Sequence, residues 1–217
     1  MVKPMPGELP DKNLFMMCET LNRGALGTLP PGFHARTCRR EELDLWKRIH
    51  FDTLEEARKY YSFMTEFFEN VYAPKGDLFY QKCTFVCGAD DVPVGTCFIW
   101  KAYDAVNTIH WFKVVKSHEG RGIGRALLSL VMEELRAEDY PVFLHTQPGS
   151  YRAIKLYSDF GFALLSDPVI GNRVNHLEEC LPMLKELVPE DVFRNLKIAR
   201  APQFFLDAVK SSEIHQF

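Results

Sequence analysis

The spacing of hydrophobic residues divides the chain into segments with helical and strand-like periods. Between residues 54 and 72 apolar side chains recur at intervals of three and four, and residues 40–49 have a similar pattern. Residues 33–38 alternate between apolar and polar side chains, as in a strand. We therefore predict helices over 40–49 and 54–72, a strand over 33–38 and a short helix over 14–21.

The next block is typical of β-structure. Aromatic and β-branched residues concentrate in the segments 84–87, 94–103 and 108–115. Short connections rich in Gly, Asp and Asn separate them. Consecutive strands with short links form an antiparallel meander, so we predict one over residues 84–115.

The period then changes to that of alternating helices and strands. Residues 122–137 and 150–160 have helical spacing, and the apolar segment 141–146 between them is short enough for a strand. The predicted fold class is therefore α/β (α+β), with a mixed, mostly antiparallel central sheet flanked by helices. Residues 177–187 and 202–211 also look helical, and we interpret them as packing or oligomer surface.

Composition and charge exclude several classes of protein. The chain has 217 residues, a net charge of −3 and a pI near 6.2, so no global positive field favours nucleic acid or an anionic membrane. No uncharged stretch is long enough to span a bilayer, and the N-terminus has no apolar signal segment. The six cysteines form no Cys-x-x-Cys pair. We expect a cytoplasmic, reduced protein without a metal site.

Three glycines at alternate positions mark the segment that carries chemistry. Gly120, Gly122 and Gly124 lie between the last meander strand and a predicted helix. The first amides of that helix, from about Arg121 to Ala126, have no acceptor within the helix and favour an anion. Arg121 and Arg125 add positive charge at the same end. A diphosphate is the expected ligand.

Two other phosphate-binding motifs are excluded. A P-loop requires Gly-Lys-Ser/Thr, which this segment lacks. A dinucleotide fingerprint requires a third glycine where this chain has Arg125, and its loop follows the first strand of a doubly wound sheet rather than a meander.

Two motifs together resemble the GCN5-related N-acetyltransferase (GNAT) superfamily. The stretch from Glu119 to Gly124 is similar to its Q/R-x-x-G-x-G/A motif, with Glu119 in place of Gln or Arg. A second pattern, N-x-x-A-x-x-x-Y-x-x-x-G-F, is met by Ser150 (in place of Asn), Ala153, Tyr157, Gly161 and Phe162. In element order the resemblance covers Phe33 to Leu165 and implies three regions: an extension over 1–31, the acetyltransferase domain over 32–166 and a helical extension over 167–217.

The resemblance implies the site residues and the co-substrate, acetyl-CoA, with no metal. Backbone groups near Val114 would hold the pantetheine, with the Val114 N–H as donor to the thioester carbonyl, and Tyr157 would be the general acid for the thiolate. A phenol remains protonated at neutral pH. The expected cofactor-binding residues are Val114, Val115, Arg121, Gly122, Ile123, Gly124, Arg125, Ala126, Ser150 and Tyr157.

The general base is left open between two histidines and no side chain at all. By alternation along its strand, His110 is expected on the face of Phe112 and Val114, and His145 is the second candidate. Acidic residues available to attract an ammonium group are Glu66, Glu69 and Asp104.

The sequence thus predicts an acetyl-CoA-dependent N-acetyltransferase in which a primary amine of a small molecule or peptide attacks directly in a ternary complex. The acceptor amine is not identified, and pairing of the C-terminal segments into a homodimer is a further hypothesis. The alternatives are a catalytically inactive acyl-CoA-binding regulatory module and a nucleotide-binding oxidoreductase.

Overall fold

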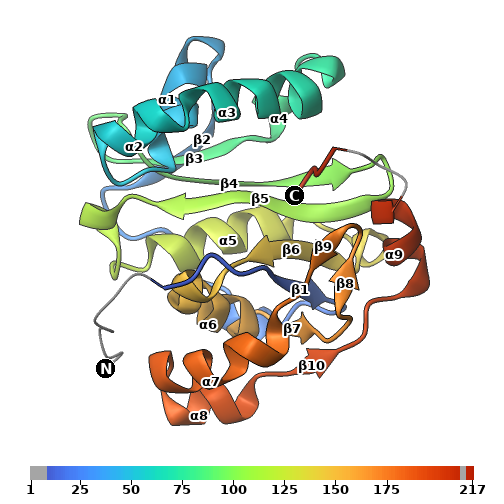
Figure 1. The fold of residues 1–217 in the computed structure, drawn as a ribbon. Coiled ribbons are helices and arrows are strands. Elements are labelled where there is room, and N and C mark those ends of the chain that lie inside the picture. Colours follow the sequence, from blue (N-terminus) through green and yellow to red (C-terminus); the bar gives the residue numbers. More distant parts are fainter. Residues whose placement is uncertain (1–8, 211–213) are drawn as a thin grey trace.

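An eight-stranded mixed sheet organises the chain (Figure 1). The structure is a computed structural model and describes residues 9–210 and 214–217. The strands follow one another in the order β10 (Ile198–Ala199), β7 (Phe162–Leu165), β1 (Leu14–Cys18), β6 (Val142–Thr146), β5 (Val106–Val114), β4 (Pro93–Ala102), β3 (Thr84–Cys87) and β2 (His34–Thr37). Only β5–β6 and β7–β10 pair in parallel. The predicted fold class and the meander of β3, β4 and β5 are confirmed.

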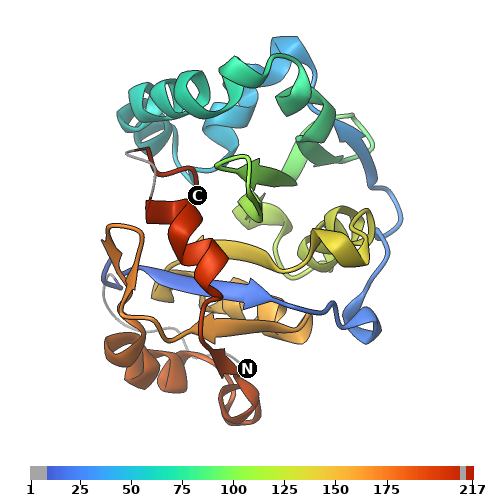
Figure 2. The ribbon, with the colours of Figure 1, turned by 90° about the vertical axis from the view of Figure 1, so that its right-hand side faces the viewer.

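Helices cover both faces of the sheet. One face carries α1 (Leu43–Ile49), α2 (Leu54–Lys59), α3 (Tyr61–Phe67), a π-helical turn (Phe68–Tyr72), α4 (Leu78–Lys82) and α9 (Gln203–Lys210). The other carries α5 (Ile123–Glu133), α6 (Tyr151–Asp159) and α7 (Leu177–Leu187). Outside the large sheet there is a two-stranded hairpin, formed by β8 (Val169–Ile170) and β9 (Arg173–Val174). A further short helix is α8 (Glu190–Asn195). Figure 2 shows α9 running towards the C-terminal residues.

Local sequence explains where the helices begin and end. The predicted helix over 54–72 is present but breaks near Tyr60 into successive pieces. Thr53 begins α2 with a capping box, because its hydroxyl accepts from the Glu56 amide and the Glu56 carboxylate accepts from the Thr53 amide. Gly161 ends α6 with a φ of 101°, which favours glycine. No helix within 9–210 and 214–217 combines the length and apolar character needed to cross a bilayer.

The prediction of a short helix over residues 14–21 is wrong. Leu14–Cys18 forms β1, which lies between β6 and β7 and is antiparallel to both. All five of its residues are buried, and alternate side chains enter the clusters on opposite faces of the sheet. A strand buried on both faces has a continuous apolar run, which periodicity alone does not distinguish from a buried helix.

The predicted division of the chain into 1–31, 32–166 and 167–217 stays a prediction. Residues on either side of those boundaries nevertheless share one sheet, because β1 and β10 both pair with β7. The sheet that positions the site therefore draws strands from all three segments.

Burial of β1 on both faces leads to a stability prediction. Met16→Asp and Met17→Asp place a carboxylate in opposite core clusters, and each should lower the free energy of unfolding by about 3–5 kcal/mol in chemical denaturation. Val92→Asp is the control, because Val92 is 51% exposed. Tolerance of either methionine substitution would contradict a central strand.

Candidate active site

Strands β5 and β6 separate after a short parallel contact. Their pairing consists of Asn107 with Val142 and Thr108 with Phe143. Further along β5 the register with β4 shifts by one residue, and Trp111 adopts a φ of 51°. Because a bulge bends its strand, β5 stays paired with β4 while its distance from β6 increases. A cavity of about 520 Å³ opens here, with residues of both strands in its wall.

The same bulge changes which side chains share a face. His110 and Trp111 both pack among the aromatic rings beneath α1–α4. Phe112 lies on the opposite face, with its ring centroid 5.7 Å from that of Tyr157. Val114 belongs with Phe112, since it packs against the α5 and α6 cluster. The prediction that His110 shares the face of Phe112 and Val114 is therefore wrong, because the extra residue interrupts the alternation.

A hydrogen-bond chain defines the tautomer of His110. The Trp111 Nε1–H donates to the Tyr72 hydroxyl oxygen at 2.9 Å, and the same hydroxyl is hydrogen-bonded to His110 Nδ1. Because the Tyr72 oxygen already accepts one hydrogen bond, we assign the hydroxyl as the donor to His110. His110 therefore carries its proton on Nε2, which is sealed from solvent and has no partner among the described residues. Burial lowers the pKa of His110 to about 3, so the imidazole is neutral at pH 7. His110 thus borders the cavity as a neutral imidazole whose second N–H is sealed from solvent.

His145 lines the same cavity with the opposite polarity. The Asn13 amide NH₂ donates to the Val174 carbonyl, so its Oδ1 accepts from His145 Nε2 at 3.0 Å. The nitrogen left for a ligand is Nδ1, which carries a lone pair. Burial lowers the pKa of His145 to about 3 as well, which makes it a weak base.

The glycine loop leaves a run of backbone amides unpaired. The N–H groups from Gly120 to Arg125 have no hydrogen-bond acceptor among the described residues, and the first helical bond runs from Ala126 N to Gly122 O. The observed run therefore begins and ends one residue earlier than the predicted run from Arg121 to Ala126, because Ala126 is already paired and Gly120 is not. These amides lie at the N-terminus of α5, where the helix dipole also favours an anion.

The three glycines are favoured for two different reasons. Gly120 and Gly122 have φ values of 75° and 83°, which disfavour any residue with a Cβ. At Gly124 the restriction is contact, since a Cβ would lie 3.3 Å from Phe112 and 3.6 Å from Val114. The loop can therefore pack against β5 and still expose its amides.

A second hollow of about 850 Å³ adjoins these amides. Its wall contains Asp52, Phe112, Lys113, Val114, Lys116, Glu119, Gly120, Gly122, Gly124, Arg125, Gly149, Ser150, Tyr151, Arg152, Ala153 and Leu156. Phe112, Ser150 and Ala153 also line the first cavity, so the two spaces share a wall. We call them the loop hollow and the strand cavity.

The charges around the loop hollow differ from those predicted. The Arg125 guanidinium donates to the Ala25 carbonyl at 2.8 Å and to Asp159 Oδ2 at 2.6 Å, so its charge is already paired. Arg125 lies at the expected end of α5, but it adds less net charge there than expected because Asp159 balances it, and its amide is unpaired. Arg121 is exposed. The Glu119 carboxylate pairs with Arg152 at 2.9 Å, which offsets its repulsion of an anion.

The backbone of β5 distinguishes the two valines. The Val115 N–H donates to Val94 O at 2.8 Å, so it is not available to a ligand, and Val115 lines neither space. Amides alternate in direction along a strand, so the Val114 N–H points away from β4 and towards the side where β6 has separated. Ile123 is 1% exposed and has only its amide to offer.

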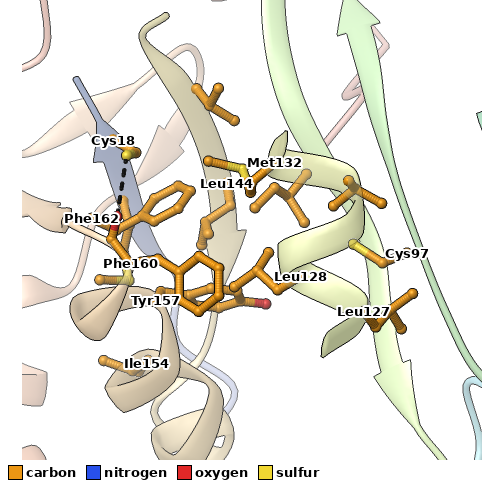
Figure 3. Close-up of a cluster of buried hydrophobic side chains, with 14 of the residues drawn as sticks. Cys18, Cys97, Leu127, Leu128, Met132, Leu144, Ile154, Tyr157, Phe160 and Phe162 are labelled. Carbon is orange, nitrogen blue, oxygen red and sulfur yellow. Dashed lines mark hydrogen bonds between the residues drawn. The ribbon is translucent and has the colours of Figure 1, made fainter. Parts of the chain in front are cut away.

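Tyr157 extends from α6 towards α5, as Figure 3 shows. Its side chain lines the strand cavity, and its hydroxyl has no hydrogen-bond partner among the described residues. Burial raises the pKa of this phenol well above 10, so it stays protonated. Ser150 precedes α6 and lines both spaces without capping the helix through its side chain.

Part of the strand cavity comes from residues that the sequence did not indicate. Arg173 of β9 and His215, Gln216 and Phe217 contribute to its wall. Gln216 is held by Tyr103, whose amide donates to Gln216 Oε1 at 2.8 Å. No local sequence pattern marks these four residues as part of a site, because only the fold brings them to β5 and β6. The one available signal is that Arg173 is a charged residue in a short hairpin.

The predicted acidic residues do not line this cavity. Its wall contains Phe63, Phe67, Ile109, His110, Trp111, Phe112, Leu144, His145, Thr146, Gln147, Ser150, Ala153, Tyr157, Arg173, His215, Gln216 and Phe217. Glu66, Glu69 and Asp104 are absent from it, and Asp104 pairs with Lys75. In the described wall, Arg173 is the one residue that is charged at pH 7, because the histidines there are neutral.

Comparisons with known proteins agree with this geometry. The profile of the acetyltransferase (GNAT) family matches residues 44–162. No curated protein matches the chain. A tandem GNAT protein from the clavulanic acid biosynthesis pathway has a similar fold, with 13% identity, a TM-score of 0.50 and coverage of 70% of this chain and 50% of that one.

Two further solved structures have lower scores. A Drosophila protein has 17% identity and a TM-score of 0.47, covering 70% of this chain and 48% of its own. A GCN5-related N-acetyltransferase from Sphaerobacter thermophilus has 21% identity and a TM-score of 0.43, covering 64% and 43%. The chain matches about half the length of these structures.

The lowered pKa of His110 predicts a loss of stability in acid. The unfolded chain takes up a proton near pH 6.5, whereas folded His110 resists it until about pH 3. Below pH 6.5 the free energy of unfolding should therefore fall, by up to about 1.4 kcal/mol per pH unit for this residue. Above pH 6.5 this residue should have no effect on it. Denaturation of His110→Asn between pH 7 and 4 should give a shallower slope, and equal slopes would contradict the burial of a neutral imidazole.

Proposed function

This chain belongs to the acetyltransferase (GNAT) family, and on that premise we propose that it transfers an acetyl group from acetyl-CoA to a primary amine of a small molecule or peptide. The observation that carries the proposal is the run of unpaired amides from Gly120 to Arg125, which opens on a hollow next to the strand cavity. A diphosphate in that hollow would accept hydrogen bonds from these amides.

The residues of the loop hollow fit such a ligand. Gly120 and Gly122 adopt positive φ values that leave the loop amides unpaired, and both residues line the hollow. Lys116 and Arg121 add exposed positive charge beside it. The Val114 N–H, directed to the side where β5 and β6 separate, would donate to the thioester carbonyl.

Acetyl-CoA supplies an activated thioester when bound: the amine nitrogen forms a bond to the carbonyl carbon, and the bond from that carbon to sulfur breaks. One proton leaves the amine and one is taken up by the thiolate. Tyr157 is suited to deliver the second proton, because its phenol is protonated, unpaired and in the cavity wall.

Removal of the amine proton does not require a strong base in this cavity. His110 is not suited to act as the base, because Nδ1 is hydrogen-bonded to Tyr72 and Nε2 carries a proton and is sealed from solvent. His145 presents a lone pair on Nδ1 but is weakly basic. The guanidinium of Arg173, with no carboxylate side chain in the described wall, lowers the pKa of any amine bound nearby. The amine is therefore expected to react in its neutral form, with at most a proton acceptor at His145.

The loop amides can be tested by occupying them. Gly122→Glu places a carboxylate on a residue with a φ of 83° beside the amides, and it should abolish the rise in Tm that acetyl-CoA produces in the unmodified protein. Gly76→Glu is the matched control, since Gly76 also has a positive φ, of 61°, and open space around it. A chain whose Tm responds to neither acetyl-CoA nor coenzyme A at millimolar concentration would contradict the proposal.

Tyr157 can be tested by removing only its hydroxyl. Tyr157→Phe should lower kcat by about 10²–10⁴ and leave the acetyl-CoA Tm shift unchanged, because the hydroxyl acts on the leaving group rather than on binding. Release of free thiol across a panel of amines gives the rate. If the unmodified protein binds acetyl-CoA but acetylates none of the amines, the inactive acyl-CoA-binding module is favoured instead.

A further inference from the structure

Arg173 lies in the wall of the strand cavity and has no carboxylate partner among the residues that the structure describes. The hairpin of β8 and β9 (orange in Figure 1) presents it, and its guanidinium lies 4.8 Å from the ring centroid of Phe15 and 5.4 Å from that of Phe217. Its Nε is sealed from solvent and has no hydrogen-bond acceptor in the described part of the chain. The guanidinium forms no ion pair with a described residue, and burial lowers the pKa of Arg173. A buried donor without an acceptor is costly, so this arrangement suits a ligand that supplies one.

The charge balance of the cavity indicates which ligand. Burial lowers the pKa of His110 and His145 to about 3 and also lowers that of His215, so all three are neutral at pH 7. No aspartate or glutamate is part of the described wall. The side chains in the described part of the wall therefore carry one positive charge, which a carboxylate monoanion would balance and a phosphate dianion would exceed.

The remaining wall is mostly apolar. Phe63, Phe67, Ile109, Trp111 and Leu144 line a space of about 520 Å³, which lies within the usual range for a small-molecule site. The cavity meets the loop hollow at Phe112, Ser150 and Ala153, and Arg173 is not part of that shared wall. An acceptor whose amine lies near the shared wall and whose body fills the strand cavity would therefore bring a polar group at its other end to Arg173.

We propose that the acceptor carries a carboxylate that Arg173 binds, and that the substrate class is amino acids or short peptides with a free carboxylate and an apolar body. The planar guanidinium carries two terminal nitrogens, whose N–H groups match the two oxygens of a carboxylate. This inference rests on the proposed function, because it assigns the acceptor of that reaction.

The experiment compares each acceptor with its uncharged counterpart. Leucine and phenylalanine are offered as free acids and as carboxamides, which keep the amine and side chain but lack the negative charge. Arg173→Gln should lower kcat/KM for the acids by about 10- to 100-fold, mainly through KM, and change kcat/KM for the amides by less than about 3-fold. Comparing variants for each acceptor cancels the difference in amine basicity.

Two variants separate charge recognition from structural damage. Arg173→Lys keeps the charge without the planar fork and should recover part of the preference for acids. Arg194→Gln is the matched control, because Arg194 is exposed on α8 and pairs with Glu190. Arg173→Gln removes the contacts of the guanidinium with Phe15 and Phe217, so the Tm of each free variant is measured first and every ligand-induced shift is taken relative to it. The inference is overturned if the unmodified protein acetylates the amides and not the acids, or if Arg173→Gln reduces both alike.

Binding without turnover distinguishes this inference from the proposed function. N-acetylleucine, which has a carboxylate and no reactive amine, should raise the Tm of the unmodified protein and not that of Arg173→Gln. If it does so while acetyl-CoA has no effect, the carboxylate site stands and acetyl transfer fails. If acetyl-CoA raises the Tm and N-acetylleucine does not, the carboxylate inference alone fails.

Discussion

The early separation of β5 from β6 is the constraint on which the site depends. Hydrogen bonding joins the two strands at Asn107 and Thr108, and the bulge at Trp111 then keeps β5 with β4 instead. Had the parallel ladder continued, the Val114 N–H would be paired within the sheet and no space would exist between the strands. The bulge thus makes part of an interior strand the wall of a cavity and leaves the Val114 N–H available as a donor. The N-terminus of α5 lies next to it and offers the six unpaired amides from Gly120 to Arg125.

The two spaces on either side of this wall have different electrostatics. The loop hollow combines unpaired amides with exposed cations, and its acidic residues Asp52 and Glu119 are paired with Lys113 and Arg152. The strand cavity is largely aromatic, with neutral histidines and the single guanidinium of Arg173. An anionic carrier is therefore favoured in the first space and a smaller, less highly charged ligand in the second. Because they share Phe112, Ser150 and Ala153, ligands in both would lie next to one another.

Sequence reasoning succeeded where function depends on local spacing. The glycines of the loop and the position of Tyr157 on α6 follow from neighbours in the chain, and the structure brings both to the same pair of spaces. It failed for His110, because a positive φ at a tryptophan has no sequence signature and reverses the expected face. Arg173 was missed for another reason: its position beside Phe15 and Phe217 depends on contacts between distant segments.

The position of β1 has a consequence for how the protein is made. Its apolar residues pair with Val142–Thr146 and Phe162–Leu164, which the ribosome adds long after Leu14–Cys18 has emerged. Until then an extended hydrophobic segment has neither of its neighbouring strands, and such non-local pairing is slow and prone to association with other chains. In the nascent polypeptide this segment therefore stays without its partner strands until synthesis reaches the second half of the sheet.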